Sequence, residues 1–243
     1  MKEKGRLLFF ILPSVAIVLF ILLVFVGALS YEGGNRLDHN SIGYSFSNNY
    51  LSDLGRIKTV AGHNNSIPFY CFNSSLIILS VVFSFYFLFL PSIYDESPKI
   101  QNIARIGSIF GFLASICFAG VGYTPADLFL DAHIFFADWL FRLMNLTIIS
   151  YALAYVMMKR SYFIFSFIFA IVAVVVSSHI IISDFGLAKY FSEPHTVRVL
   201  SQKAATIALI ISVPLMTIYN RKRLASHPIT LKIFNFKNIS IKN

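Results

Sequence analysis

The sequence predicts an all-α, polytopic membrane protein: a bundle of six transmembrane helices with both termini in the cytoplasm. The first observation is composition, since 57% of the 243 residues are hydrophobic and only 13% are charged. Soluble domains average about 45–50% apolar and about 25% charged residues. The second is that six stretches each hold the roughly 20 apolar residues that a helix needs to cross a bilayer. The third is an unequal division of basic residues between the two predicted sides.

The first stretch, 7–29, follows the basic segment MKEKGR and ends near Ala28 and Ser30, which are typical of signal cleavage sites. Its apolar run exceeds the about 7–15 residues of a signal peptide, so we interpret it as a retained span. The other five predicted spans are 68–94, 103–123, 128–157, 162–185 and 196–219. They predict one transmembrane domain over 1–219 with an outer loop, 31–67, and a basic cytoplasmic tail, 220–243.

The net charge of +9 follows from membrane orientation and does not indicate a nucleic-acid partner. With the N-terminus inside, thirteen basic residues face the cytoplasm: Lys2, Lys4, Arg6, Lys99, Arg105, Lys159, Arg160, Arg221, Lys222, Arg223, Lys232, Lys237 and Lys242. Five face outward: Arg36, Arg56, Lys58, Lys189 and Arg198. This is the positive-inside bias of cell-membrane proteins, and the lipid bilayer is therefore the expected partner.

The third predicted span carries a strip of small residues. Gly107, Gly111, Ser115 and Ala119 recur every four positions and so share one helix face. Such strips let helix backbones approach closely in lipid. The strip therefore predicts close packing within the bundle, and a homodimer through Gly107 and Gly111 is the alternative.

Ionisable residues crowd the fourth predicted span. The spacing of Asp127, Asp131, Asp138 and Arg142 places them on one helix face, whereas His133 lies on another. At 1.5 Å per residue, Asp138 would lie about 15 Å and Arg142 about 20 Å below the outer end of the span, near the middle of the bilayer. Their i, i+4 spacing allows a structural ion pair or part of a ligand or proton site, and the sequence leaves both open.

Other predicted spans become polar at a similar depth near the outer face. His179 lies in the fifth span, and Arg198, Gln202 and Lys203 occupy the first turns of the sixth. Charged groups inside a span usually face protein or a water-filled cavity. The sequence therefore predicts an outward-facing polar pocket, with these candidate residues: Asp53, Asn73, Asp127, Asp131, His133, Asp138, Arg142, His179, Gln202 and Lys203.

The sequence predicts no cofactor. Zinc is an alternative because His133 and His179 are weak candidate ligands, but no compact motif such as H-E-x-x-H is present. Cys71 and Cys117 form neither a metal-binding pair nor a disulfide framework. No nucleophile elbow or phosphate-binding glycine loop occurs, so the sequence favours a non-enzymatic protein.

Three short motifs resemble a prokaryotic six-span membrane family called domain of unknown function 998. They are YLSDLG in the outer loop, FNSSLII at the start of the second span, and GVGYTPADLFLDAH between the third and fourth spans. The resemblance implies a six-span fold and no established activity. Its pattern falls on Ser52, Asp53, Leu54, Gly55, Asn73, Pro125, Asp127 and His133, with SQKAA as a counterpart of its last-span motif at Gln202 and Lys203.

Three functional hypotheses follow. The first is a protein that binds, transports or senses a small polar molecule or lipid head group in the outward-facing pocket. The second is a membrane-embedded hydrolase or transferase, metal-dependent or not, that acts on lipid with His133 as base or metal ligand and Asp127 or Asp131 as its partner. The third is a structural or assembly subunit whose polar residues only hold helices together.

Overall fold

The structure is a computed structural model that describes residues 2–158, 162–226 and 230–235. Its main helices are α1 (Lys2–Arg6), α2 (Leu12–Leu29), α3 (Ser66–Phe89), α4 (Pro98–Tyr123), α5 (Leu130–Val156), α6 (Phe163–Asp184) and α7 (Pro194–Ser226). A π-helical segment, η1 (Leu7–Ile11), joins α1 to α2, and the short 3-10 helices are η2 (Leu51–Gly55), η3 (Leu90–Ile93), η5 (Leu187–Tyr190) and η6 (Ile233–Asn235). The described residues contain no strand.

Six of these helical segments are long and apolar enough to cross a membrane, which confirms the predicted six-span, all-α fold. Two boundaries differ from the prediction by five residues or more. Helix α4 begins at Pro98, five residues early, because Ser97 Oγ accepts a hydrogen bond from the Ile100 amide and Pro98 occupies the first turn. Helix α7 continues to Ser226, so the first part of the predicted tail is helical; 227–229 and 236–243 lie outside the described residues.

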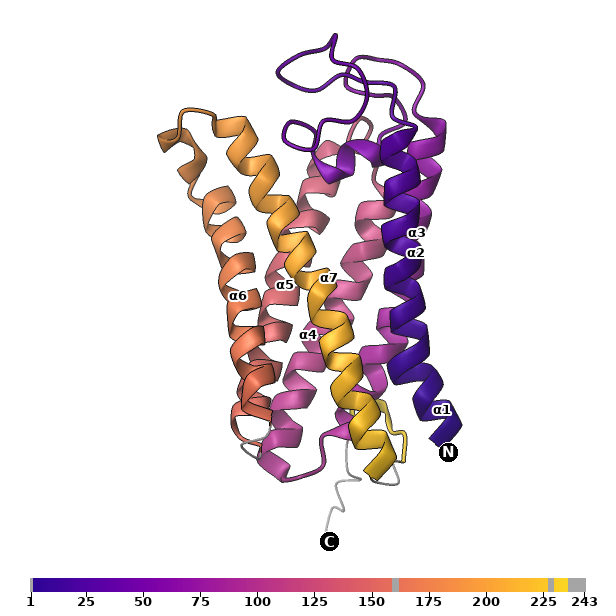
Figure 1. Ribbon diagram of the computed structural model, residues 1–243, viewed down its shortest axis with the longest axis vertical. Coiled ribbons are helices and arrows are strands. Elements are labelled where there is room, and N and C mark those ends of the chain that lie inside the picture. Colours follow the sequence, from indigo (N-terminus) through magenta and orange to yellow (C-terminus); the bar gives the residue numbers. More distant parts are fainter. Residues whose placement is uncertain (1, 159–161, 227–229, 236–243) are drawn as a thin grey trace, which may run out of the picture.

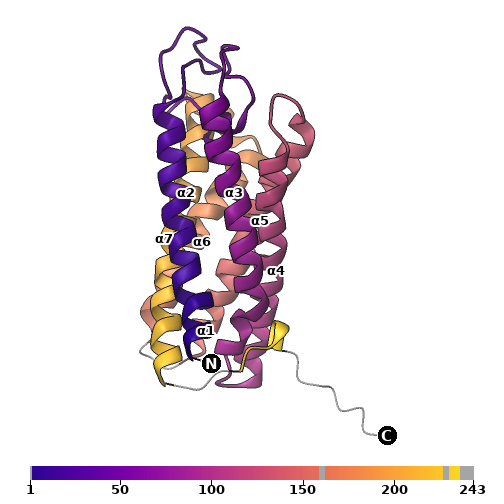
Figure 2. The same ribbon diagram turned by 90° about the vertical axis from the view of Figure 1, so that its right-hand side faces the viewer.

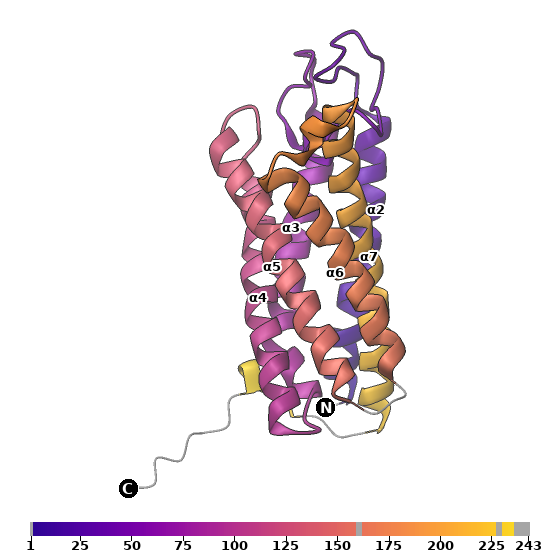
Figure 3. The ribbon, with the colours of Figure 1, turned by 90° about the vertical axis from the view of Figure 1, so that its left-hand side faces the viewer.

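Each long helix packs against the next one in the chain, and α7 returns to pack against α2, which closes a ring (Figures 1 and 2). Figure 3 shows the side where α6 lies between α5 and α7. The start of α1 and the end of α7 lie at the same end of the bundle, which we call the terminal end. The segment 30–65 covers the opposite end, which we call the loop end.

The outside of the bundle is apolar along its length. Phe25 in α2 is 60% exposed, Val174 in α6 is 65% exposed, and Phe167 and Ile207 are also exposed. Apolar surface this continuous is unfavourable in water and favourable in lipid tails. The exposed side chains therefore support a membrane environment for the whole bundle.

The small-residue strip of α4 packs inside the chain. A Cβ atom on Gly107 would lie 2.8 Å from Ser150 Cβ, and one on Gly111 would lie 2.6 Å from the Phe87 ring. Both distances are shorter than carbon atoms tolerate, so only glycine permits α4 to approach α5 and α3 this closely. The two glycines that could have supported a homodimer are thus occupied by contacts within the bundle.

Tyrosines fill the terminal end. Tyr94, Tyr151, Tyr155 and Tyr219 are all 0% exposed, and the Tyr94 ring contacts the rings of the other three. Their hydroxyl groups find partners: the Tyr94 and Tyr155 oxygens are 3.0 Å apart, and the Tyr151 hydroxyl lies 2.6 Å from Ser108 Oγ. This end of the bundle is therefore both densely packed and internally hydrogen-bonded.

Candidate ligand-binding site

The YLSDLG motif forms η2, which is pressed into the loop end of the bundle (Figure 1). Leu54 is fully buried, and Asp53 is 3% exposed. The Asp53 carboxylate accepts hydrogen bonds from the Tyr50 amide at 2.9 Å and from Asn49 Nδ2 at 3.3 Å. Burial raises the pKa of this carboxyl above its usual range, although these hydrogen bonds and two nearby arginines, Arg36 and Arg56, oppose the rise.

Two asparagines hold η2 by its backbone. Asn65 Nδ2 donates to three carbonyl groups within 53–56, and Asn73 Nδ2 donates to the Gly55 carbonyl at 3.2 Å. A Cβ atom on Gly55 would lie 2.6 Å from the Phe72 ring, so the motif needs glycine at that position. Asn73, a predicted pocket residue, thus satisfies buried backbone groups in this structure.

Two side chains of helix α7 bond to the backbone of the same loop. Gln202 Oε1 accepts a hydrogen bond from the Leu51 amide at 3.1 Å. Lys203 is 4% exposed, and its Nζ donates to the Asn49 carbonyl at 2.6 Å and to the Phe46 carbonyl. All the hydrogen bonds that the structure gives to this ammonium group go to backbone carbonyls, so Lys203 serves as a tether for the loop.

Asp127 lies before α5 and not on its polar face. The prediction that Asp127 continues this helix face is wrong, because the segment after Pro125 forms a turn and the helix begins only at Leu130. Its carboxylate accepts hydrogen bonds from the Ile57 amide at 3.0 Å and the Lys58 amide at 3.0 Å, and so joins two connections of the loop end. Asp131, in the first turn of α5, is exposed.

A cavity of about 330 Å³ opens at the loop end between η2, α5, α6 and α7. We call it the outer cavity. Its lining is rich in polar groups, which are Arg36, Tyr50, Ser52, Asp53, His133, Asp138, His179, Ser183, Arg198, Ser201 and Gln202. The volume and the mixed lining are within the range of small-ligand sites in proteins.

Two arginines of this lining have no acidic partner. Arg36 comes from the loop, where its guanidinium lies 5.1 Å from the centre of the Tyr50 ring, and Arg198 comes from the second turn of α7. Neither arginine forms an ion pair with a described residue. Their guanidinium groups are therefore not engaged in ion pairs and can donate hydrogen bonds to an anion in the cavity.

His133 is 5% exposed and lines the outer cavity from the first turn of α5. Its Nδ1 lies 2.7 Å from the Thr124 carbonyl oxygen, and a carbonyl can only accept, so Nδ1 carries the proton. In the neutral ring Nε2 is then an acceptor, and it is buried without a hydrogen-bond partner. An orphaned buried acceptor is costly unless a ligand or water satisfies it.

His179 is oriented by α7. The Ser201 hydroxyl donates to the Arg198 carbonyl at 2.9 Å, so its oxygen accepts the hydrogen of His179 Nδ1 at 3.0 Å. Nε2 is consequently the acceptor nitrogen of the His179 ring, and this residue lines the outer cavity. In the described parts of the chain, no three histidine, cysteine, aspartate or glutamate side chains converge as metal ligands usually do.

The predicted ion pair in α5 has a third member. Arg142 Nη1 lies 3.6 Å from Asp138, and Arg142 Nη2 lies 2.6 Å from Asp184, the last residue of α6. The cluster therefore links α5 to the loop end of α6. Asp138 belongs to both the cluster and the outer cavity, whereas Arg142 does not line the cavity.

The structure divides the ten predicted pocket residues into two groups. Asp53, His133, Asp138, His179 and Gln202 line the outer cavity, whereas Asn73, Asp127, Asp131, Arg142 and Lys203 do not. Arg36 and Ser52, both in the loop, line the cavity and were not among the candidates. Arg198 was also missed, although its i, i+4 relation to Gln202 places both on one face of α7.

Comparison of the chain with protein-family models, with curated proteins and with solved structures finds no match. The resemblance of its three short motifs to domain of unknown function 998 therefore stays a prediction. The site has to be interpreted from its own geometry.

Proposed function

We propose that the bundle lies in the cell membrane with the terminal end in the cytoplasm and the loop end outside. The support is the thirteen-to-five division of basic residues, since Lys and Arg accumulate on cytoplasmic segments. In this orientation the outer cavity opens to the external face.

The function that the geometry supports best is binding of a small anionic molecule, or of an anionic lipid head group, in the outer cavity. The observation that carries this proposal is the pair Arg36 and Arg198, two guanidinium groups that line one cavity without acidic partners. Guanidinium groups suit phosphate and carboxylate because they donate two parallel hydrogen bonds. Transport and sensing are both compatible with such a site.

Neither acidic residue of the lining forms an ion pair with these arginines. Asp138 is paired with Arg142, and burial makes the charged form of Asp53 less favourable. The two guanidinium groups therefore remain available to donate hydrogen bonds to an anion that enters the outer cavity.

Calorimetric titration of the protein in phosphatidylcholine nanodiscs with glycerol phosphate tests this proposal. Arg198→Gln and Arg36→Gln should each weaken binding about tenfold or more, because each removes a charge-assisted hydrogen-bond donor. Arg56→Gln is the matched control, since Arg56 also lies at the loop end but does not line the outer cavity. Equal binding by all four proteins, or an equal loss in the control, would contradict the proposal.

A membrane-embedded hydrolase or transferase is the second candidate, and His133 favours it. Its unprotonated Nε2 has the form that a general base needs, in a cavity that could hold a substrate. His133→Gln should then abolish turnover of an ester or phosphoester lipid. Absence of turnover in the unsubstituted protein with a panel of such lipids would remove this candidate.

A further inference from the structure

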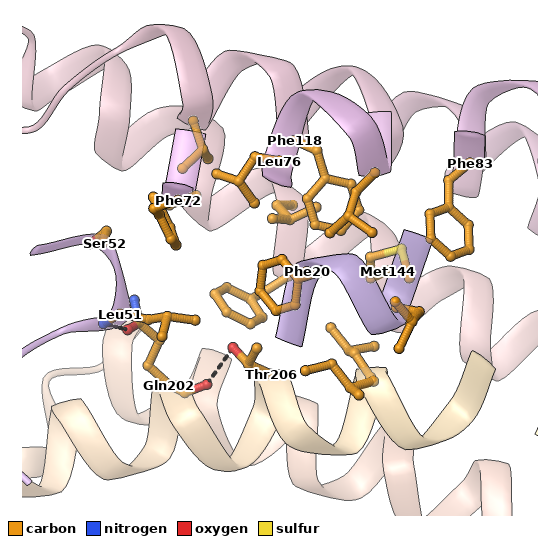
Figure 4. A pocket seen from close by; sticks show the side chains of 18 of the residues that line it. Phe20, Leu51, Ser52, Phe72, Leu76, Phe83, Phe118, Met144, Gln202 and Thr206 are labelled. Carbon is orange, nitrogen blue, oxygen red and sulfur yellow. Dashed lines mark hydrogen bonds between the residues drawn. The ribbon is translucent and has the colours of Figure 1, made fainter. Parts of the chain in front are cut away.

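A second cavity lies deeper in the bundle, next to the outer cavity. It has a volume of about 100 Å³ and is surrounded by α2, α3, α4, α5 and α7 beneath η2 (Figure 4). We call it the deep cavity. The two cavities share five lining residues, which are Ser52, His133, Ala137, Phe141 and Gln202. They therefore adjoin, and we call these five residues, which lie between them, the neck.

The lining of the deep cavity is almost entirely apolar. Aromatic and aliphatic side chains such as Phe20, Phe72, Leu76, Phe118 and Met144 surround it (Figure 4). The one polar residue of its lining outside the neck is Thr206, and the Thr206 hydroxyl already donates to the Gln202 carbonyl at 2.9 Å. Apolar cavities of this size exclude water and accept apolar guests, so this space suits hydrocarbon.

The polarity of the combined space changes along its length. Unpaired arginines lie in the outer cavity, His133 offers an orphaned acceptor at the neck, and only apolar side chains line most of the deep cavity. A purely polar ligand would leave the deep cavity empty. A purely apolar ligand would leave the arginines and His133 Nε2 without partners.

We propose that the ligand is an anionic amphiphile, with its anionic group between Arg36 and Arg198 and its aliphatic chain passing Ala137 into the deep cavity. A hydroxyl group at the junction of head and chain would donate to His133 Nε2. This inference rests on the proposed function, because the head-group site is the outer cavity. It adds the class of ligand, which the outer cavity alone does not define.

A series of n-alkyl phosphates from methyl to octyl, with inorganic phosphate as the chainless member, tests the proposal. Titrations are made calorimetrically in phosphatidylcholine nanodiscs, and uptake by empty nanodiscs is subtracted. Affinity should increase about fourfold per methylene, the equivalent of about 0.8 kcal/mol, until the deep cavity is filled. Inorganic phosphate binding as tightly as octyl phosphate would mean that the ligand is a free anion and would overturn the inference.

Ala137→Leu should remove the gain with chain length, because Ala137 lines both cavities at the neck. Ala132→Leu is the matched control: it makes the same change on the same helix, at a residue that lines neither cavity. Thr206→Ile, in α7, reduces the volume of the deep cavity and is a second test if Ala137→Leu does not fold. A chain-length gain that persists in both folded cavity variants would reflect partition into lipid and would overturn the inference.

The two proposals fail in different ways. If the phosphate group binds and Arg198→Gln weakens it, but chain length has no effect, the ligand class is wrong and the anion site stands. If no member of the series binds more weakly to Arg198→Gln than to the unsubstituted protein, the anion site itself is wrong.

Discussion

The two ends of the bundle differ in the hydrogen-bond partners of their polar side chains. At the terminal end, tyrosine hydroxyls bond to one another and to Ser108, and Arg223 is paired with Asp95 and with Glu96 at 3.5 Å. At the loop end, polar side chains bond mainly to backbone groups of the segment 30–65. Two cavities and the orphaned His133 Nε2 remain there, and the exposed Arg36 and Arg198 form no ion pair with a described residue.

This difference separates stability from function within one fold. A densely packed end, whose tyrosine hydroxyls are hydrogen-bonded, holds the helices together and offers little room to a ligand. A hollow end with unsatisfied groups costs stability, and such a cost is typical of binding sites. The three predictions below test this contrast, from the largest expected effect to the smallest.

Tyr94→Ala tests the closed end and should have the largest effect. It removes a fully buried ring and leaves the Tyr155 hydroxyl without its partner, so the free energy of unfolding should fall by about 3–5 kcal/mol. Denaturant unfolding in detergent measures this loss. Tyr123→Ala, at a residue 71% exposed in α4, is the control and should change stability by less than about 0.5 kcal/mol.

The folded fraction of Tyr94→Ala should still bind glycerol phosphate with unchanged affinity, because the outer cavity lies at the other end of the bundle. Loss of binding without loss of stability would show that the two ends are not separate in function.

Lys203→Met tests whether this lysine stabilises the loop or binds a ligand. Two buried carbonyl groups lose a charged donor, which should lower the free energy of unfolding by about 2–3 kcal/mol. The segment 44–50 should also become accessible to protease. Lys189→Met, at an exposed lysine in η5, is the control and should do neither. Unchanged stability together with weaker anion binding would instead make Lys203 a ligand residue.

Asp53→Asn tests the polar loop end through the pH dependence of stability. Its effect should be the smallest, because hydrogen bonds and arginines offset part of the rise in the Asp53 pKa that burial causes. The folded chain binds the Asp53 proton more tightly than the unfolded chain, whose aspartate pKa is about 3.9. The free energy of unfolding should therefore fall as pH rises from about 4 until the folded-state pKa is passed, and this fall should be absent in Asp53→Asn.

Unfolding titrations of both proteins across this pH range measure the difference. Asp131→Asn, at an exposed carboxylate, is the matched control and should parallel the unsubstituted protein. A difference between Asp53→Asn and the unsubstituted protein that does not vary with pH would contradict a raised pKa at Asp53.

The candidate site was only partly predictable from sequence. Their positions along the predicted spans placed His133, His179 and Gln202 near the loop end, and all three line the outer cavity. Lys203 had the same sequence signal as Gln202, yet it bonds to a carbonyl 157 residues away in sequence. Arg36 carried no periodic signal at all, because it lies in the loop, whose path depends on the helices beneath it.

The sequence by itself determined the six apolar helices, because the length and hydropathy of a span are local properties that add up along a single segment. It also determined which end of the bundle is rich in polar groups. Only the tertiary structure decided which of these groups are satisfied by the protein and which face a cavity. Hydrogen-bond partners and empty volumes arise between segments distant in the chain, as with Asp127 and the amides of 57–58, and hydropathy does not contain that information.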